Sequence, residues 1–295
     1  MRETKAMALS PPGPQKTFLN ACLKLCRRAA GASSMLPSLV VSALFILLTL
    51  VLAHAARRLI DNIIKDPFIR QLLQEFIAAA ELCGCCFELI IVADNFGVST
   101  YAVFLFLLTI WWSLNWGDAT ACPYTHMEDV VKGETDIRTA IIKSFFELSG
   151  GMLVFKYVQL LWSLEIAETH RDRAFSDCST DLQVPVLYGA AIEGVATCLC
   201  RLASKTLSDL GPRFSTAIDS FIATSLVVAA FDYSGGYFNP VLATSLKYGC
   251  HGNTLIEHVV VYWMGASLGA IASVYLYRHP TVQKLLIGEE KEKEE

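Results

Sequence analysis

The chain has 295 residues, of which 54% are hydrophobic, and its mean hydropathy is positive. Its formal net charge of −4 gives no reason to expect a nucleic-acid partner. Several apolar runs reach the roughly 20 residues that a helix needs to cross a bilayer. The composition therefore indicates an all-α, multi-pass membrane protein surrounded by membrane lipid.

The first part of the chain, residues 1–66, is predicted to stand apart from the main membrane domain. Residues 1–34 carry six Lys or Arg, and an apolar run over residues 36–53 follows them. The lead-in is long and no clear small-residue cleavage site follows the run, which argues against a signal peptide. We expect an extra apolar helix that is either an uncleaved anchor or a helix lying at the membrane surface.

Six further spans are predicted, at residues 69–93, 98–117, 138–164, 184–204, 213–231 and 255–277. The number of Lys and Arg between them alternates, with four in residues 54–70, none in 93–99 and three in 118–144. Because basic loops stay in the cytosol, this alternation predicts that the six-span core begins and ends there, with a cytosolic C-terminus.

The second half of the predicted core repeats the pattern of the first. Glu75 precedes Cys122 by 47 residues, Glu193 precedes Asn239 by 46, and a proline follows Cys122 and Asn239. Each unit has three spans, an odd number, so the two copies are predicted to form an inverted repeat with a site near the membrane midplane. The expected boundaries are 67–280 for this domain, 67–165 and 184–280 for its repeats, and 281–295 for a charged tail.

The loop over residues 232–249 lies between two predicted spans and contains Ser-Gly-Gly-Tyr-Phe-Asn-Pro. Asn239 is a favoured helix N-cap and Pro240 suits the first helical position, so a short helix is predicted to run from there to Lys247. Such a helix inside a membrane domain is tolerated where its free backbone groups are buried or face water. Its N-terminus carries a partial positive charge that suits ordering water and repelling cations.

This motif resembles the second pore loop of the aquaporin (major intrinsic protein) family, where a re-entrant half-helix opens with Asn-Pro-Ala. Here Val241 takes the place of the alanine. In the first loop, residues 118–133, the sequence Cys122-Pro123-Tyr124 stands where Asn-Pro-Ala is usual. This departure is similar to the unorthodox (super-) aquaporins of intracellular membranes, and Cys-Pro-Tyr resembles their insect branch. The resemblance covers roughly residues 70–280.

The resemblance implies a fold, an assembly and roles for particular residues. It implies an aquaporin-like inverted repeat of six spans and two half-helices that meet at Cys122 and Asn239, and a homotetramer with one pore per subunit. Glu75 and Glu193 are ionisable residues inside predicted spans, which is costly unless they face the protein interior. By resemblance they accept hydrogen bonds from the pore-loop backbone.

The sequence does not favour an enzyme. The two glutamates have no nucleophile or histidine partner at a telling spacing, so neither catalysis nor a cofactor is predicted. The run from His126 to Asp129 is interpreted as the half-helix continuing toward the cytosol, and no metal site is predicted.

Three residues are predicted to line the outer selectivity filter. Leu242 takes the place where orthodox water channels have an arginine, and the family spacing places Val227 and Ala102 opposite it. An apolar filter predicts a passive channel for water and small uncharged solutes such as glycerol or hydrogen peroxide. The alternative is a non-conducting scaffold or adhesion protein that keeps the fold, because apolar constrictions can also stay dry.

The remaining signals concern the cysteines and the C-terminal tail. Five of the ten cysteines lie in apolar runs and are interpreted as small packing residues, namely Cys83, Cys85, Cys86, Cys198 and Cys200. Cys178 and Cys250 lie on one predicted side of the membrane, and the sequence leaves open whether they form a disulfide. Lys291 and Lys293 resemble the dilysine retrieval signal of the endoplasmic reticulum, with an ordinary solvated tail as the alternative.

Overall fold

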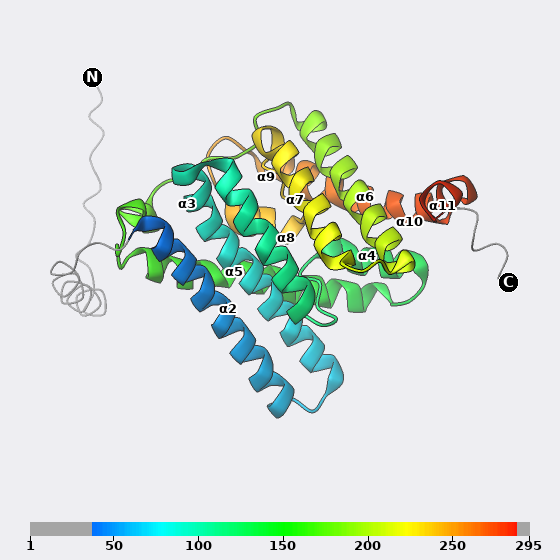
Figure 1. Ribbon diagram of the computed structural model, residues 1–295, viewed down its shortest axis with the longest axis horizontal. Helices are drawn as coiled ribbons and strands as arrows, with labels where there is room; N and C mark the ends of the chain where they lie inside the picture. The colour runs from blue at the N-terminus through cyan, green and yellow to red at the C-terminus, as the bar shows by residue number, and fades with distance from the viewer. Residues whose placement is uncertain (1–36, 288–295) are drawn as a thin grey trace, which may run out of the picture.

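The computed structural model describes residues 37–287, and the regular structure within them is helical (Figure 1). The helices are α2 (Ser38–Ile63), α3 (Pro67–Asn115), α4 (Pro123–Lys132), α5 (Ile137–Trp162), α6 (Val186–Leu210), α7 (Ser215–Ser234), α8 (Pro240–Lys247), α9 (Leu255–His258), α10 (Ala266–Arg278) and α11 (Pro280–Ile287). Short turns η1 (Glu168–His170) and η2 (Arg173–Phe175) follow α5, and η3 (Val259–Gly265) joins α9 to α10. The basic lead-in 1–34, Lys291 and Lys293 lie outside the described residues.

Within this range, five helical stretches are long and apolar enough to cross a membrane: α2, α3, α6, α7 and Leu255–Arg278. The 49-residue α3 supplies two of the predicted spans, because it folds back at Gly97, whose φ of 82° favours glycine. Trp111 and Trp116 in its second arm donate hydrogen bonds of 3.1 and 3.0 Å to Glu81 in its first arm. The two arms therefore lie side by side, and the chain is a multi-pass membrane protein with the expected all-α fold.

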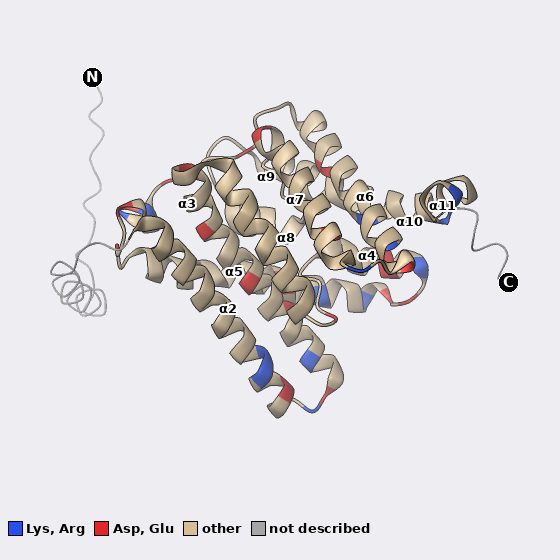
Figure 2. Cartoon of the chain, in the orientation of Figure 1, with Lys and Arg blue, Asp and Glu red and all other residues tan. Residues whose placement is uncertain are grey.

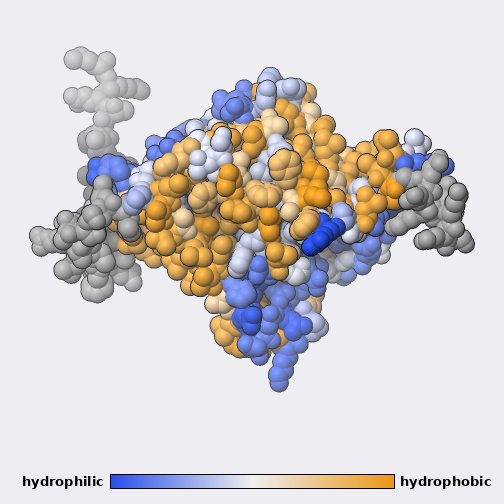
Figure 3. Space-filling view, viewed as in Figure 1, coloured by the Kyte–Doolittle hydropathy of each residue, from blue (hydrophilic) through white to orange (hydrophobic). Residues whose placement is uncertain are grey.

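The surface of the molecule matches this assignment. Figure 3 shows a broad apolar band across the middle of the visible face, and hydrophilic residues gather at its margins. Most Lys and Arg lie near helix ends and in connecting loops (Figure 2), whereas several acidic residues lie within the bundle. The arrangement places the apolar band against lipid and the charged ends in water.

The extra N-terminal helix is part of the bundle. α2 runs to Ile63, beyond the apolar run predicted over residues 36–53, and packs along α3. Arg57 near its end forms a buried ion pair with Glu81. Phe45 near its start lies against the ring of His170, with 5.1 Å between ring centroids. α2 thus begins on the side of the loop that follows α5 and ends on the opposite side.

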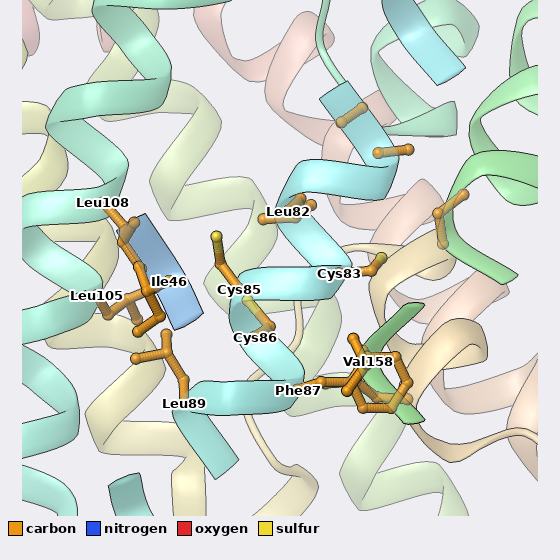
Figure 4. Close-up of a cluster of buried hydrophobic side chains, with 14 of the residues drawn as sticks. Ile46, Leu82, Cys83, Cys85, Cys86, Phe87, Leu89, Leu105, Leu108 and Val158 are labelled. Atoms are coloured by element: carbon orange, nitrogen blue, oxygen red, sulfur yellow. The ribbon is translucent and has the colours of Figure 1, made fainter. Parts of the chain in front are cut away.

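The centre of the core is packed with small and branched side chains. Figure 4 shows the cysteines of the first arm of α3 among apolar residues of α2, α5 and the second arm, including Ile46, Leu105, Leu108 and Val158. Cys83, Cys85 and Cys86 are free and buried. They act as small packing residues, as their place in an apolar run predicted.

A glycine allows two helices to cross in close contact at equivalent places in the two halves. A Cβ on Gly150 would lie 2.1 Å from the carbonyl oxygen of Phe76, and a Cβ on Gly269 would lie 2.0 Å from that of Gly194. Phe76 directly follows Glu75 and Gly194 directly follows Glu193. The same close backbone approach therefore occurs at matching places in both halves, as an internal repeat requires.

Candidate functional site

The two half-helices begin with nearly the same backbone geometry. Cys122 and Asn239 are the N-caps of α4 and α8, with φ/ψ of −150°/118° and −150°/115°. Pro123 and Pro240 occupy the first helical positions, which their fixed φ suits. The residues before the caps, Ala121 and Phe238, have φ values of 53° and 47°, a conformation uncommon for residues other than glycine. Something outside each loop must hold the chain in this shape.

Two buried glutamates supply that support. Glu75 Oε2 accepts hydrogen bonds of 2.9 and 3.0 Å from the backbone N–H groups of Thr120 and Ala121. In the other half, the carboxylate of Glu193 accepts 3.2 and 2.7 Å bonds from the N–H groups of Tyr237 and Phe238. Neither glutamate is exposed (0%). Each carboxylate satisfies two backbone donors that would otherwise be buried without partners.

The two half-helices meet end to end. The side-chain Nδ2 of Asn239 donates a 2.8 Å hydrogen bond to the carbonyl oxygen of Ala121, the residue before Cys122. Its Oδ1 accepts from the N–H groups of Val241 and Leu242 at 2.9 and 3.3 Å and caps α8. A carboxamide has two N–H donors, so one remains beyond the bond to Ala121. Cys122 makes no side-chain bond to cap α4.

The far ends of the half-helices are held by charged pairs. Glu128 of α4 is fully buried (0%) and accepts a bidentate pair of hydrogen bonds, 2.8 and 2.9 Å, from Arg201 of α6. Tyr124 of α4 lies 6.0 Å from the same guanidinium. On α8, Lys247 forms a 2.7 Å ion pair with Asp181. Bidentate pairs of this kind fix orientation as well as position.

A disulfide closes the loops on the α8 side. Cys178, after α5, is bonded to Cys250, after α8, and the sequence had left this pairing open. The neighbouring backbone adds a 2.8 Å bond from the N–H of Thr180 to the carbonyl of His251. These loops form one wall of the cavity above α8.

That cavity has a volume of about 560 Å³ and lies between the disulfide loops and α8. Leu242 lines it, whereas Ala102 and Val227 are not among its lining residues. Tyr101 and Phe231 line it instead, and their rings lie edge to face with centroids 5.2 Å apart. Tyr101 directly precedes Ala102 in α3, and Phe231 lies one helical turn after Val227 in α7. The side chains of these two neighbours face the cavity.

A polar edge borders the cavity near α8. The Tyr237 hydroxyl donates a hydrogen bond to Asp181. Burial raises the pKa of Tyr237, and Asp181 raises it further, so this hydroxyl stays protonated and remains a donor. The cavity therefore combines apolar rings with a few fixed polar groups.

A further buried carboxylate, on α5, was not anticipated from the sequence. Glu147 of α5 is unexposed (0%), and its Oε1 lies 3.1 Å from Nε2 of His126 on α4. Glu75 Oε1 lies 3.6 Å from the same nitrogen. The sequence contains a signal for such a residue, because an ionisable side chain inside a predicted span indicates a buried role. Glu147 lies inside the span predicted at 138–164, as Glu75 lies inside the span predicted at 69–93. No local pattern indicates that Glu75 and Glu147 converge on His126.

Comparison with known proteins places this geometry in a family. No protein-family profile matches the chain. It is 30% identical over 237 residues to "Aquaporin-11" of Milnesium tardigradum, covering 80% of this chain and 86% of that protein. It is 26% identical to "Aquaporin-12" of Mus musculus, covering 82% and 86%, and 23% identical to "Aquaporin-11" of Homo sapiens, covering 84% and 92%.

A solved structure shares the fold. The aquaglyceroporin from Plasmodium falciparum superposes with a TM-score of 0.55 at 14% identity, covering 73% of this chain and 99% of that one. At that identity the likeness shows the fold alone, whereas the tardigrade relative extends over most of both chains. The chain has two half-helices joined end to end, each held by a buried glutamate. This geometry and these relatives together show that the chain belongs to the aquaporin family.

Proposed function

We propose that the protein is a passive channel for water and small uncharged solutes, with glycerol and hydrogen peroxide as candidates, and that it works without a cofactor or covalent chemistry. The observation that carries the proposal is the junction at which Asn239 of one half-helix bonds the carbonyl of Ala121 at the start of the other. Two helix N-termini face this point, and their partial positive charges oppose the passage of cations. The free amide N–H of Asn239 is the donor that orients a permeant.

The motif residues have different parts in this proposal. Asn239, Pro240 and Val241 form the intact end of the conduit, where the carboxamide both caps α8 and faces the permeant. Cys122 offers a thiol in place of a carboxamide, while Pro123 still opens α4 and keeps its dipole. The conduit is therefore asymmetric, with one strong hydrogen-bond donor where an orthodox channel has two.

We propose that the outer constriction is apolar and that its low polarity determines which solutes pass. Leu242 lines the cavity without the guanidinium of an orthodox filter, which would order water and repel cations. Ala102 and Val227 remain the residues that the family spacing assigns, and Tyr101 and Phe231 present their rings at the cavity itself. A leucine flanked by aromatic rings favours solutes that are less polar than water.

A non-conducting scaffold is the second candidate. Tyr101 and Phe231 line the cavity with their rings in edge-to-face contact, 5.2 Å between centroids, and we infer that the two rings can block it. If these rings do not part, the protein keeps an aquaporin fold without flux. Measured flux separates this candidate from the channel.

The test is flux into liposomes that contain the purified protein, measured in parallel for water, glycerol and hydrogen peroxide. Tyr101→Ala widens the cavity and should raise glycerol flux, and Leu242→Arg should lower it. Tyr233→Ala is the matched control, because Tyr233 is 46% exposed and does not line this cavity. Wild-type and Tyr101→Ala fluxes that equal those of empty liposomes would favour the scaffold.

The protein is further proposed to reside in the endoplasmic reticulum with a cytosolic C-terminus. The disulfide between Cys178 and Cys250 supports loops that face an oxidising compartment, opposite the basic loops. Lys291 and Lys293 would then lie in the cytosol, where a dilysine signal is read. Replacing both lysines with alanine should release a tagged protein to the cell surface, and unchanged reticular staining would remove the retrieval argument.

Assembly and subgroup are proposed from resemblance. A homotetramer of the unorthodox, insect intracellular type would have one pore per subunit. Native mass measurement of the protein in mild detergent tests the assembly, and a monomeric mass would contradict it.

A further inference from the structure

A polar cluster beside the half-helix junction lies within the apolar bundle. Its members come from three elements: Glu75 from α3, His126 from α4 and Glu147 from α5. We propose that these three side chains bind one divalent transition-metal ion, with zinc as the ion their chemistry fits best. The proposal does not depend on whether the pore conducts.

The spacing of the three side chains is that of metal ligands. His126 Nε2 lies 3.1 Å from Glu147 Oε1 and 3.6 Å from Glu75 Oε1, and one ligand atom from each residue lies within 4.8 Å of the others. Tetrahedral zinc with bonds of about 2.0–2.2 Å holds its ligands roughly 3.3–3.6 Å apart. Small movements of the side chains would therefore suffice. One imidazole and two carboxylates form an N/O ligand set of the kind zinc accepts with three protein ligands.

Two carboxylate oxygens in the cluster accept no hydrogen bond. They are Glu75 Oε1 and Glu147 Oε2, and both residues have no exposed surface (0%). The other oxygen of Glu75 is already occupied by the backbone of the first pore loop. Buried carboxylates without partners are costly, and costlier still within a membrane. A divalent cation would compensate both charges and supply the missing partner for Glu75 Oε1, which faces the cluster 3.6 Å from His126 Nε2.

The surroundings also fit a metal site. The Thr120 hydroxyl lies 3.5 Å from Glu147 Oε1 and 2.7 Å from the Thr125 hydroxyl. Outer hydroxyl groups of this kind orient carboxylate ligands. Because the ligands come from three elements, an ion would fix the position of α4, the half-helix whose cap residue makes no side-chain bond. The ion would thus hold the first half-helix as the Asn239 carboxamide holds the second.

The test uses the full-length protein purified in detergent, stripped with a chelator and titrated with zinc in competition with an indicator. Wild type should bind one equivalent, and its melting temperature should rise with zinc. His126→Ala and Glu147→Gln should weaken binding by at least about tenfold, the effect expected for loss of a ligand or its partner. His170→Ala is the matched control, because His170 also pairs with a buried carboxylate, Glu88, at 2.8 Å and should leave zinc binding unchanged.

Cobalt in place of zinc distinguishes nitrogen and oxygen ligands from a thiolate ligand. A spectrum with visible bands of tetrahedral cobalt and no thiolate charge-transfer band supports the N/O site. A thiolate band that disappears in Cys122→Ser would place the metal on the thiol and overturn the assignment. The proposal would be overturned if wild-type protein bound no zinc, or bound it no more strongly than His126→Ala does. The carboxyl groups of Glu75 and Glu147 would then share a proton instead of a metal ion.

Discussion

Replacing Glu193 with alanine should unfold the second pore loop, and the structure allows the effect to be sized. The carboxylate accepts hydrogen bonds from the backbone N–H groups of Tyr237 and Phe238 at 3.2 and 2.7 Å, and from the Ser234 hydroxyl at 2.6 Å. Alanine leaves the two N–H groups buried without partners, and each such loss costs about 1–3 kcal/mol. The alanine variant no longer has the cost of burying the carboxylate, and this offsets part of the loss. The net loss in free energy of unfolding should be roughly 2–4 kcal/mol.

Two further variants sharpen the comparison. Glu193→Gln keeps one oxygen acceptor but turns an N–H donor toward backbone donors, so it should lose roughly half as much stability as alanine. Glu168→Ala is the control, because the side chain of Glu168 is 54% exposed and pairs with Arg171 at the surface. An exposed pair of this kind contributes about 0–1 kcal/mol.

The assay is thermal unfolding of the detergent-solubilised protein followed by tryptophan fluorescence, with liposome flux as the functional reading. The alanine variant should melt well below wild type and lose flux, and the glutamine variant should fall between them. If Glu193→Ala melts within the error of Glu168→Ala, the carboxylate does not hold the loop and the reasoning about its hydrogen bonds is refuted.

Three other substitutions test the bundle around the site, each by the same melting assay. Arg57→Ala leaves Glu81 buried without its ion-pair partner and should cost about 3–5 kcal/mol, less what the tryptophan donors retain; unchanged melting would mean that α2 is held by apolar packing alone. Gly269→Ala places a Cβ 2.0 Å from the carbonyl of Gly194 and should separate α6 from α10, so a wild-type melting curve would contradict the close crossing. Cys178→Ser opens a disulfide that spans 72 residues and should cost up to about 4 kcal/mol, and a reduced wild-type sample should melt like the variant.

Much of the fold could be predicted because the signals are local or repeated. Apolar runs of about 20 residues predicted the spans. The matched spacing from Glu75 to Cys122 and from Glu193 to Asn239 predicted two pore loops in opposite orientation. Capping rules predicted where both half-helices begin, because a cap residue followed by proline acts within a few residues of itself.

What escaped prediction depends on contacts between distant segments. Glu147 carried the same signal as Glu75, but its meeting with His126 depends on how α5 crosses α4. Tyr101 was missed as a cavity residue because positions were counted along helices, where a shift of one residue turns a side chain by about 100°. Arg57 pairs with Glu81 because α2 lies along α3, and no local pattern indicates that contact.

The central claim is that solutes pass between Cys122 and Asn239, and accessibility of the Cys122 thiol during transport tests it most directly. The measurement is solute flux into liposomes before and after a small mercurial reagent, in a background where the partly buried Cys198 and Cys200 are replaced by serine. We expect flux above that of empty liposomes, loss of most of this flux on treatment, and resistance to the reagent in the added Cys122→Ser variant. Absence of flux before treatment, or equal inhibition with and without the Cys122 thiol, would contradict it.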